Sequence, residues 1–257
     1  NILYVKEGAA GDGSSWDKSA DLADALKWAN EKVDENLWDE NSPLQIYVAT
    51  GTYLPKYSPE DGVVNSENPV NNRDKTFLLV KNVQLYGGFD LENSITELSH
   101  QRIIPSVAGG APANGTILSG DLGASDIDSD NAYHVVLSVG DVGKAVLDGF
   151  TIRKGYAKTE EVAFAVRQVN VNRGYGGGML NLAGSSPKLR NVMIGDHSAV
   201  YGGGVYSDQS SPVLSNVILS GNEATTNGGG MYNWDQSSPV LTDVVVSNNT
   251  ANTNGGG

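Results

Sequence analysis

The sequence predicts an all-β fold, a parallel β-helix, from a repeated glycine triplet and from the motifs between the triplets. The triplets lie at 176–178, 202–204, 228–230 and 255–257. A Ser-Ser-Pro motif follows the same rhythm, at 185–187, 210–212 and 237–239. A period of about 26 residues indicates a solenoid, because a propeller blade needs about 40–45 and the apolar runs lack helical spacing. The repeat suits a coil of three short strands, each stacked on its equivalent in the previous coil.

The residues inside each repeat suit bends between strands. Glycine reaches positive φ at no steric cost and lets stacked backbones approach closely, so the triplets predict corners that recur in register. Asn191, Asn216 and Asp243 occupy one repeat position. They predict either a ladder of side chains or a turn in the αL conformation, which Asn and Asp tolerate. A flexible glycine linker fits less well, because a linker does not keep register with Ser-Ser-Pro.

A capping α-helix is predicted near the N-terminus, from about Asp21 to Lys32. Asp21 is a suitable N-cap residue, and apolar side chains recur at helical spacing on one face. That face comprises Leu22, Ala25, Leu26 and Ala29. The first coil of a solenoid exposes an apolar end and unpaired backbone groups, which a helix laid over it protects. A helix that binds a partner is the alternative.

One domain is predicted to occupy residues 1–257. It begins with a strand and the capping helix over 1–43, continues with irregular coils and long loops over 44–173, and ends with regular coils over 174–257. The last glycine triplet opens a further repeat. The coils are therefore predicted to continue beyond the C-terminus, which makes the chain the N-terminal part of a longer protein.

Composition excludes several classes of protein. The net charge of −13 repels a phosphate backbone, so no nucleic-acid partner is expected. No stretch approaches the roughly 18 consecutive apolar residues of a transmembrane helix, so no transmembrane segment is expected. The sequence contains no cysteine, which excludes disulfides and thiolate metal sites.

The acidic segment over 121–130 contains the candidate metal ligands Asp126, Asp128 and Asp130. In an extended chain their alternation would project three carboxylates to one side, and calcium prefers such clustered oxygens. An EF-hand is excluded, because Asn131 and Leu137 stand where that motif needs Gly and Glu. Calcium is the one cofactor that the sequence suggests, and a solvated loop without a metal is the alternative.

Aromatic side chains gather around the glycine corners. They are Tyr175, Tyr201, Tyr206, Tyr232 and Trp234. Tyr206 and Tyr232 each lie two residues beyond a glycine triplet, so stacked repeats would align them on one face. Such a row predicts a contact strip for a glycan or protein ligand, with Tyr206, Tyr232 and Trp234 as binding residues. Rings that only fill space over the glycines are the alternative.

The repeats contain few groups of side chains that could catalyse a reaction together, and no catalytic residue is assigned. Hydrolysis of a glycan needs two carboxylates across the bond, and a lyase needs a base together with a cation. Asp208 and Asp235 lie in matching loops between coils, while Lys188 and Arg190 are basic residues of the regular repeats. His134, at the head of an apolar strand, is predicted to be structural.

The order of several motifs along the chain carries a family resemblance. They are YVK at 4–6, GSSW at 13–16, DL at 21–22, AL at 25–26, IYVA at 46–49, GTY at 51–53, LYGGF at 85–89, ILSGD at 117–121, NAYHVV at 131–136 and LDGFTI at 147–152. They resemble right-handed parallel β-helix proteins of the secreted bacterial surface type, especially those of Bacteroidetes. The glycine triplets resemble those of polymorphic outer-membrane-type adhesins. The resemblance implies a right-handed coil, secretion to the cell surface in association with the outer membrane, and contact with export or outer-membrane machinery.

The predicted function is a non-catalytic secreted or cell-surface module, for adhesion, for binding a glycan or protein, or as an extended stalk of a longer exported protein. This prediction follows from a repeat without a catalytic constellation and from the resemblance. A polysaccharide lyase or glycoside hydrolase of the β-helix type is the alternative. A groove in which Lys or Arg meets two carboxylates would favour that enzyme.

Overall fold

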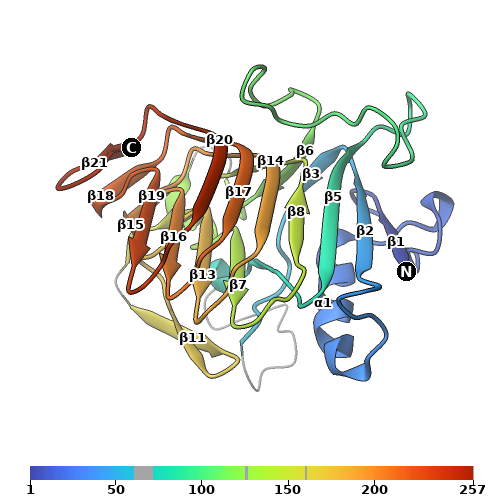
Figure 1. The fold of residues 1–257 in the computed structure, drawn as a ribbon, viewed down its shortest axis with the longest axis horizontal. Helices are drawn as coiled ribbons and strands as arrows, with labels where there is room; N and C mark the ends of the chain where they lie inside the picture. The colour runs from blue at the N-terminus through green and yellow to red at the C-terminus, as the bar shows by residue number, and fades with distance from the viewer. Residues whose placement is uncertain (61–71, 125–126, 160, 257) are drawn as a thin grey trace.

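The computed structural model describes residues 1–60, 72–124, 127–159 and 161–256. Within these ranges the chain consists mainly of short strands, most of them paired in parallel, together with a single α-helix (Figure 1). Short 3₁₀ turns lie at Trp16–Lys18, Val33–Glu35, Asn72–Asp74 and Asp128–Asp130. The prediction of an all-β class is therefore confirmed.

The glycine-rich repeats form three parallel sheets. The first repeat supplies β13 (Met179–Leu182), β14 (Lys188–Gly195) and β15 (Ser198–Tyr201). The second supplies β16 (Val205–Asp208), β17 (Val213–Ser220) and β18 (Glu223–Asn227). The third supplies β19 (Met231–Trp234), β20 (Val240–Ser247) and β21 (Thr250–Ala251). Each strand pairs with its equivalent in the next repeat, as Leu189 pairs with Leu214 and Leu214 with Leu241. Figure 1 shows β14, β17 and β20 side by side.

The strands before the repeats extend the same sheets. They are β1 (Ile2–Val5), β2 (Leu44–Ala49), β3 (Gly51–Tyr53), β4 (Phe77–Leu78), β5 (Val83–Phe89), β6 (Thr116–Ser119), β7 (Val136–Val139), β8 (Val146–Asp148), β9 (Phe150–Arg153) and β10 (Tyr156–Ala157). The first sheet runs in the order β1, β2, β5, β8, β14, β9, β6, β3, and β17 and β20 continue from β14. The second runs β4, β7, β13, β16, β19, and the third runs β10, β15, β18, β21.

The predicted N-terminal helix is present as α1 (Leu22–Lys32). The Asp21 carboxylate accepts hydrogen bonds from the N–H groups of Ala23 at 2.8 Å and Asp24 at 3.4 Å, which satisfies donors at the helix N-terminus. The predicted apolar face, Leu22, Ala25, Leu26 and Ala29, is buried. It belongs to the same hydrophobic cluster as the inward side chains of the strands, so the helix packs on the interior between the sheets.

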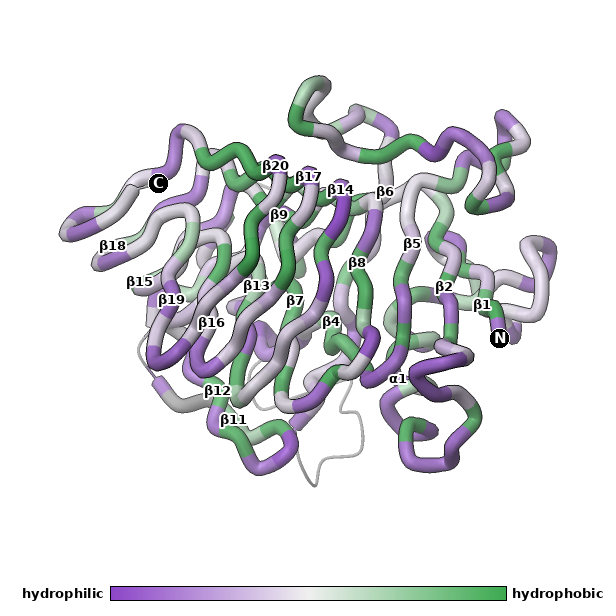
Figure 2. Tube along the Cα trace, viewed as in Figure 1, coloured by the Kyte–Doolittle hydropathy of each residue, from purple (hydrophilic) through white to green (hydrophobic). Residues whose placement is uncertain are grey.

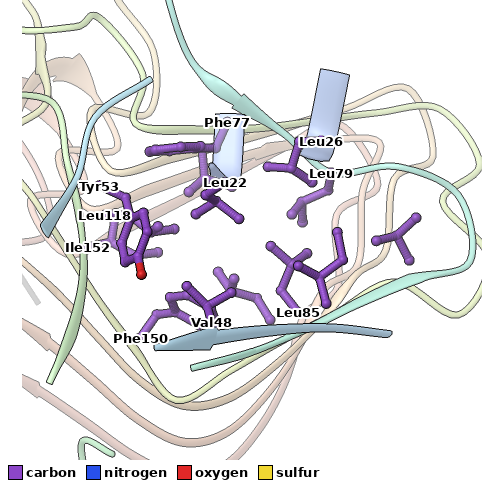
Figure 3. Close-up of a cluster of buried hydrophobic side chains, with 14 of the residues drawn as sticks. Leu22, Leu26, Val48, Tyr53, Phe77, Leu79, Leu85, Leu118, Phe150 and Ile152 are labelled. Carbon is purple, nitrogen blue, oxygen red and sulfur yellow. The ribbon is translucent and has the colours of Figure 1, made fainter. Parts of the chain in front are cut away.

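The interior is a column of aliphatic side chains. Inward positions alternate along each strand, and the parallel register stacks them into rows. One such row is Ile46, Leu85, Leu147, Leu189 and Leu214, each at most 1% exposed. Figure 3 shows Leu22 and Leu26 of the helix directed into this interior. Burial of apolar surface, at about 25 cal/mol per Å², is the main stabilising term for such a column.

The third glycine of each of the first three triplets makes room for a ladder of polar side chains. The ladder consists of His197, Asn222 and Asn249 at equivalent repeat positions. Each donates a side-chain N–H, at 2.9–3.0 Å, to a backbone carbonyl of the preceding turn of the chain, on Ile152, Ile194 and Leu219 respectively. A Cβ on the third glycine of its repeat would lie 2.8–2.9 Å from each ladder side chain, as Gly204 illustrates beside Asn222. The first glycine of each triplet has positive φ, 64° at Gly202. Both predicted roles of the triplets, corners and close approach, are confirmed.

A second ladder joins the Asn positions that the repeat predicted. Asn191, Asn216 and Asp243 all adopt the αL conformation, with φ of 50–53°. The side-chain amide of Asn216 donates to Asn191 Oδ1 at 2.7 Å, and that of Asn191 donates to Asp148 Oδ1 at 2.8 Å. The two predicted alternatives, a ladder and an αL turn, therefore occur together. Asp148 also pairs with the Arg102 guanidinium at 3.0 Å, which ties the ladder to the loop before β6.

Candidate functional site

The outward face of the second sheet changes character along its length. Met179 and Val205 point inward, which places the following residues, Leu180 and Tyr206, on the outward face. In register from β4 to β19, the outward row is Leu78, Leu137, Leu180, Tyr206 and Tyr232. Leucines therefore give way to tyrosines at β16, the fourth strand of this sheet counted from β4.

An antiparallel hairpin, β11 (Val162–Val166) with β12 (Val169–Asn172), covers the leucine part of the row. The buried cluster under it contains Phe164, Val166 and Val171 of the hairpin and Leu78, Leu137 and Leu180 of the sheet. Figure 2 shows hydrophobic residues along the hairpin. Arg173, directly after β12, forms an ion pair with Glu161 at 3.3 Å, which joins the two ends of the hairpin, and one with Asp74 at 2.7 Å, which ties the hairpin to the 3₁₀ turn before β4. The sequence analysis missed this hairpin.

Next to the covered cluster, the tyrosine part of the row opens into a hollow that we call the aromatic groove. Its lining comprises Tyr175, Tyr201, Tyr206, Asp208, Asn227, Tyr232 and Trp234, and its volume is about 490 Å³. The structure therefore brings together the three residues predicted to bind a ligand, Tyr206, Tyr232 and Trp234. Of the lining residues, Asn227 had not been singled out, because nothing in its own sequence neighbourhood marks it.

The rings of the aromatic groove are ordered against one another. Tyr206 stacks on Tyr175, with centroids 4.6 Å apart and planes inclined by 16°, and Tyr232 stacks on Trp234 at 6.2 Å and 14°. Tyr206 and Tyr232 are 5.7 Å apart. Tyr206 is only 4% exposed and fills space at the floor, whereas Trp234 is 54% exposed and offers a ring face to solvent. Burial raises the pKa of Tyr206, so its phenol is neutral at ordinary pH.

Asp208 is the one charged residue in the described lining of the aromatic groove. The predicted loop position of Asp208 is wrong, because the pairing of Asp208 with Trp234 extends β16 one residue beyond its apolar pattern. Its Oδ1 atom is buried and has no hydrogen-bond partner among the described residues. Burial, and secondarily the charge of Asp235, raises the pKa of Asp208. Asp235 itself accepts a hydrogen bond from Gln209 Nε2 at 2.7 Å.

A second hollow, which we call the charged pocket, lies beside the ends of β3, β6 and β9. Its lining comprises Glu7, Thr52, Leu54, Ser119, Asp121, Gly123, Arg153 and Lys154, with a volume of about 480 Å³. Glu7 Oε2 accepts the Thr52 N–H at 3.0 Å. Lys154 pairs with Asp128 at 3.6 Å, while Arg153 makes no ion pair with any residue that the structure describes. Basic residues thus meet two carboxylates here.

The predicted calcium ligands only partly fall within the described chain. Asp126 lies outside the described residues. Asp128–Asp130 forms a 3₁₀ turn, so the predicted extended conformation is wrong for this pair, and a 3₁₀ turn does not align alternate side chains. Asp128 pairs with Lys154, and Asp130 Oδ2 accepts the Ala124 N–H at 2.9 Å. Over the described ranges no group of three or more His, Cys, Asp or Glu residues could hold a metal, and calcium stays a prediction.

Two histidines are buried in structural surroundings. His134 Nδ1 lies 3.1 Å from the Gly176 carbonyl, and burial lowers the pKa of this residue to about 4. His197 Nδ1 accepts the Gly155 N–H at 2.9 Å, and burial lowers the pKa of His197 to about 3. Neutral imidazoles that bond to backbone groups agree with the structural role predicted for His134.

Comparisons with models of protein families, with curated proteins and with solved structures returned no significant match. The geometry of the aromatic groove and of the charged pocket therefore carries the functional assignment. None of the helices in the described ranges has the length and apolar character needed to cross a membrane.

Proposed function

We propose that the protein is a non-catalytic module that binds a glycan in the aromatic groove. The observation that carries this proposal is the outward row of the second sheet, which changes from leucines under a hairpin to tyrosines around an uncovered hollow. Tyr and Trp rings combine an apolar face with a polar tip. A sugar ring has the matching surfaces, a flat C–H face and hydroxyl groups at its edge, so a glycan suits these rings better than a purely apolar ligand.

The dimensions of the aromatic groove agree with this ligand class. A volume of about 490 Å³ lies within the range of about 300–1,000 Å³ that small-molecule sites occupy. Tyr232 and Trp234 are nearly parallel, and the exposed ring of Trp234 provides a face on which a sugar can stack. Asp208 and Asn227 add polar groups at the same surface, and such groups fix the orientation of a bound ligand.

We do not propose catalysis in the aromatic groove. Glycoside hydrolysis uses two carboxyl groups about 5–10 Å apart that flank the scissile bond. Asp208 is the one acidic residue of the described lining, and none of the described lining residues is Lys or Arg. The groove therefore offers a binding surface without the second group that either hydrolysis or elimination requires.

The wider setting is proposed from the repeat and from the motif resemblance. Parallel, in-register pairing of equivalent strands supports a parallel β-helix that forms one domain, with α1 as its cap. A right-handed coil is favoured, because crossover connections between parallel strands are almost always right-handed. The resemblance supports a secreted adhesin-like protein at the cell surface, associated with the outer membrane and its export machinery.

One observation favours a second candidate function, a polysaccharide lyase or glycoside hydrolase. In the charged pocket Arg153 and Lys154 meet Glu7 and Asp121. Elimination needs a base and a group that stabilises developing negative charge, and hydrolysis needs two carboxyl groups. Arg153, which has no ion-pair partner in the described chain, is the group available to a substrate there.

Affinity measurements with groove variants test the proposed function. A panel of neutral, acidic and amino oligosaccharides is titrated by calorimetry against the protein and against Tyr232→Ala and Trp234→Ala. We expect at least one ligand to bind, and each variant to lose at least about tenfold in affinity, as central aromatic contacts do. Trp28→Ala is the matched control, because Trp28 is 37% exposed on α1 and does not line the groove.

The same panel is incubated with the protein and assayed for unsaturated and reducing ends. Turnover that Arg153→Ala abolishes would establish the second candidate function and contradict a non-catalytic role. Binding that Trp28→Ala weakens as much as Trp234→Ala would place the glycan elsewhere on the molecule.

A further inference from the structure

We infer that the glycan bound in the aromatic groove carries free amino groups, and that Asp208 is the counter-charge that selects them. The ligand class is a polymer of amino sugars whose amines are not acetylated and are therefore cationic. This inference rests on the proposed function and names the substrate class of the same site.

The described lining of the aromatic groove carries negative charge and no positive charge. Asp208 is the one charged side chain in the described lining, and Asp235 follows the lining residue Trp234 directly. No described lining residue is a Lys or an Arg, and the chain as a whole carries a net charge of −13. An acidic glycan would meet the Asp208 carboxylate and no cation of the described lining, so the charge of the groove disfavours it.

The protein does not itself neutralise Asp208. The Lys158 ammonium pairs with Glu223 at 3.1 Å, and Lys188 and Arg190 lie on β14 of the first sheet, whereas Asp208 lies in the second. Among the described residues Asp208 forms no ion pair, and its Oδ1 atom is buried without a hydrogen-bond partner. Oδ1 is closed to solvent and therefore to a ligand, but Asp208 as a whole is only partly buried, so a ligand can meet the exposed part of this residue. A hydroxyl could donate a hydrogen bond there, but an ammonium donates one and also compensates the charge of the poorly solvated carboxylate.

The pKa of Asp208 is shifted in the direction expected for a carboxylate without a compensating charge. Burial and the neighbouring Asp235 raise its pKa, which means that the empty groove destabilises the anion. A bound cation reverses both effects, because it replaces lost solvation and screens the second carboxylate.

The rings around Asp208 suit the same ligand. Tyr175 and Tyr201 meet edge to face, with planes at 86°, while Tyr232 and Trp234 are nearly parallel at 14°. Ring faces are therefore presented in more than one direction. The face of an aromatic ring attracts a cation, so one ring can stack on a sugar while another faces its ammonium group.

Calorimetry at about pH 6 tests the inference with three matched hexamers, namely β-1,4-linked glucosamine, N-acetylglucosamine and glucose. This pH lies between the ordinary pKa values of a carboxyl group and of an amino group. We expect the glucosamine hexamer to bind at least about tenfold more tightly than the other two. We expect Asp208→Asn to abolish that preference while leaving the affinity for the acetylated hexamer within about twofold. Added salt should weaken only the binding of the glucosamine hexamer, a readout that needs no variant.

Asp243→Asn is the matched control for charge. It removes the same charge from the first sheet, and Asn already occupies the equivalent position in the two preceding repeats. We expect this variant to retain the preference for glucosamine.

Equal affinity for the three hexamers, with loss of binding in Trp234→Ala, would overturn the inference while leaving glycan binding intact. Hexalysine that binds as tightly as the glucosamine hexamer would also overturn it, because charge alone would then suffice. Failure of every hexamer and of the wider panel would overturn the proposed function itself.

Discussion

Leu180 and Tyr206 are register partners in neighbouring strands, yet the hairpin covers the leucine and the tyrosine forms the floor of an open groove. Tyr206 is still buried, and the row becomes partly exposed one strand later, at Tyr232. Positions on the covered side should therefore contribute mainly to stability, and exposed positions on the open side mainly to binding.

A pair of truncations separates these two roles. Phe164 of the hairpin is 6% exposed, and Phe164→Ala should lower the free energy of unfolding by about 3–5 kcal/mol, because removal of a buried aromatic side chain leaves a cavity. Tyr232→Ala, at a partly exposed position of the groove, should cost about 1 kcal/mol in folding while weakening glycan binding. Urea unfolding of both variants provides the comparison. Equal losses of stability would mean that Tyr232 serves to fill space.

The glycine triplets make a prediction about close approach. A Cβ on Gly204 would lie 2.5 Å from the Gly230 carbonyl oxygen and 2.9 Å from the Asn222 side chain, so Gly204→Ala should cost at least about 3 kcal/mol or prevent folding. Gly184 has φ of 84° but no atom within 4 Å of such a Cβ. Gly184→Ala should cost only the backbone strain of about 1–2 kcal/mol. Similar unfolding midpoints for the two variants would contradict the packing described for the triplets.

The buried histidines predict that stability falls in mild acid. The folded-state pKa values of His134 and His197, about 4 and about 3, lie below the ordinary value of about 6.5. Below pH 6.5 the unfolded chain therefore binds protons that the folded chain does not. Stability should be full above about pH 6.5 and decrease, by up to about 1.4 kcal/mol per pH unit for each histidine, as the pH falls toward the folded-state values.

His197→Asn tests this pH dependence with a residue that the ladder already uses. Asn222 repeats the bonds of His197, because its amide donates to the Ile194 carbonyl and its Oδ1 accepts the His197 N–H. The variant should keep most of its stability at pH 8 and show a shallower loss between about pH 6.5 and 5. Urea titrations across this range measure both slopes, and identical slopes would show that His197 does not titrate on unfolding.

Arg153 provides a prediction for the charged pocket. It makes no ion pair with the described residues, so Arg153→Ala should change stability by no more than about 0.5 kcal/mol. The affinity of the Arg153→Ala variant for the glycan should equal that of the unaltered protein, because Arg153 does not line the aromatic groove. Thermal unfolding and calorimetry measure the two quantities. A large loss of affinity would place the ligand in the charged pocket.

Features that depend on neighbouring residues could be predicted from the sequence. The N-cap at Asp21, the helical spacing that follows it, the glycine corners and the αL positions at Asn191 and Asn216 all have local causes, and the structure contains them. The gathering of Tyr206, Tyr232 and Trp234 could also be predicted, because repeats in register place equivalent residues on one face.

Features that depend on distant segments could not be predicted. Period-two alternation indicates which side chains point inward, but it does not show that the hairpin β11–β12 returns to cover Leu180. In the same way, the Val107 N–H donates to Asn216 Oδ1 at 2.9 Å across 109 positions of sequence, and no local pattern indicates this contact. The burial of Asp208 Oδ1 could not be predicted either, because it depends on how neighbouring repeats pack against one another.

A crystal structure with the tightest-binding oligosaccharide decides whether the aromatic groove is the glycan site. We expect a sugar ring stacked on Trp234 and Tyr232, with a donor of the ligand within hydrogen-bond distance of Asp208. We also expect the charged pocket to hold no sugar. An oligosaccharide bound beside Arg153, with the aromatic groove vacant, would contradict the proposed function.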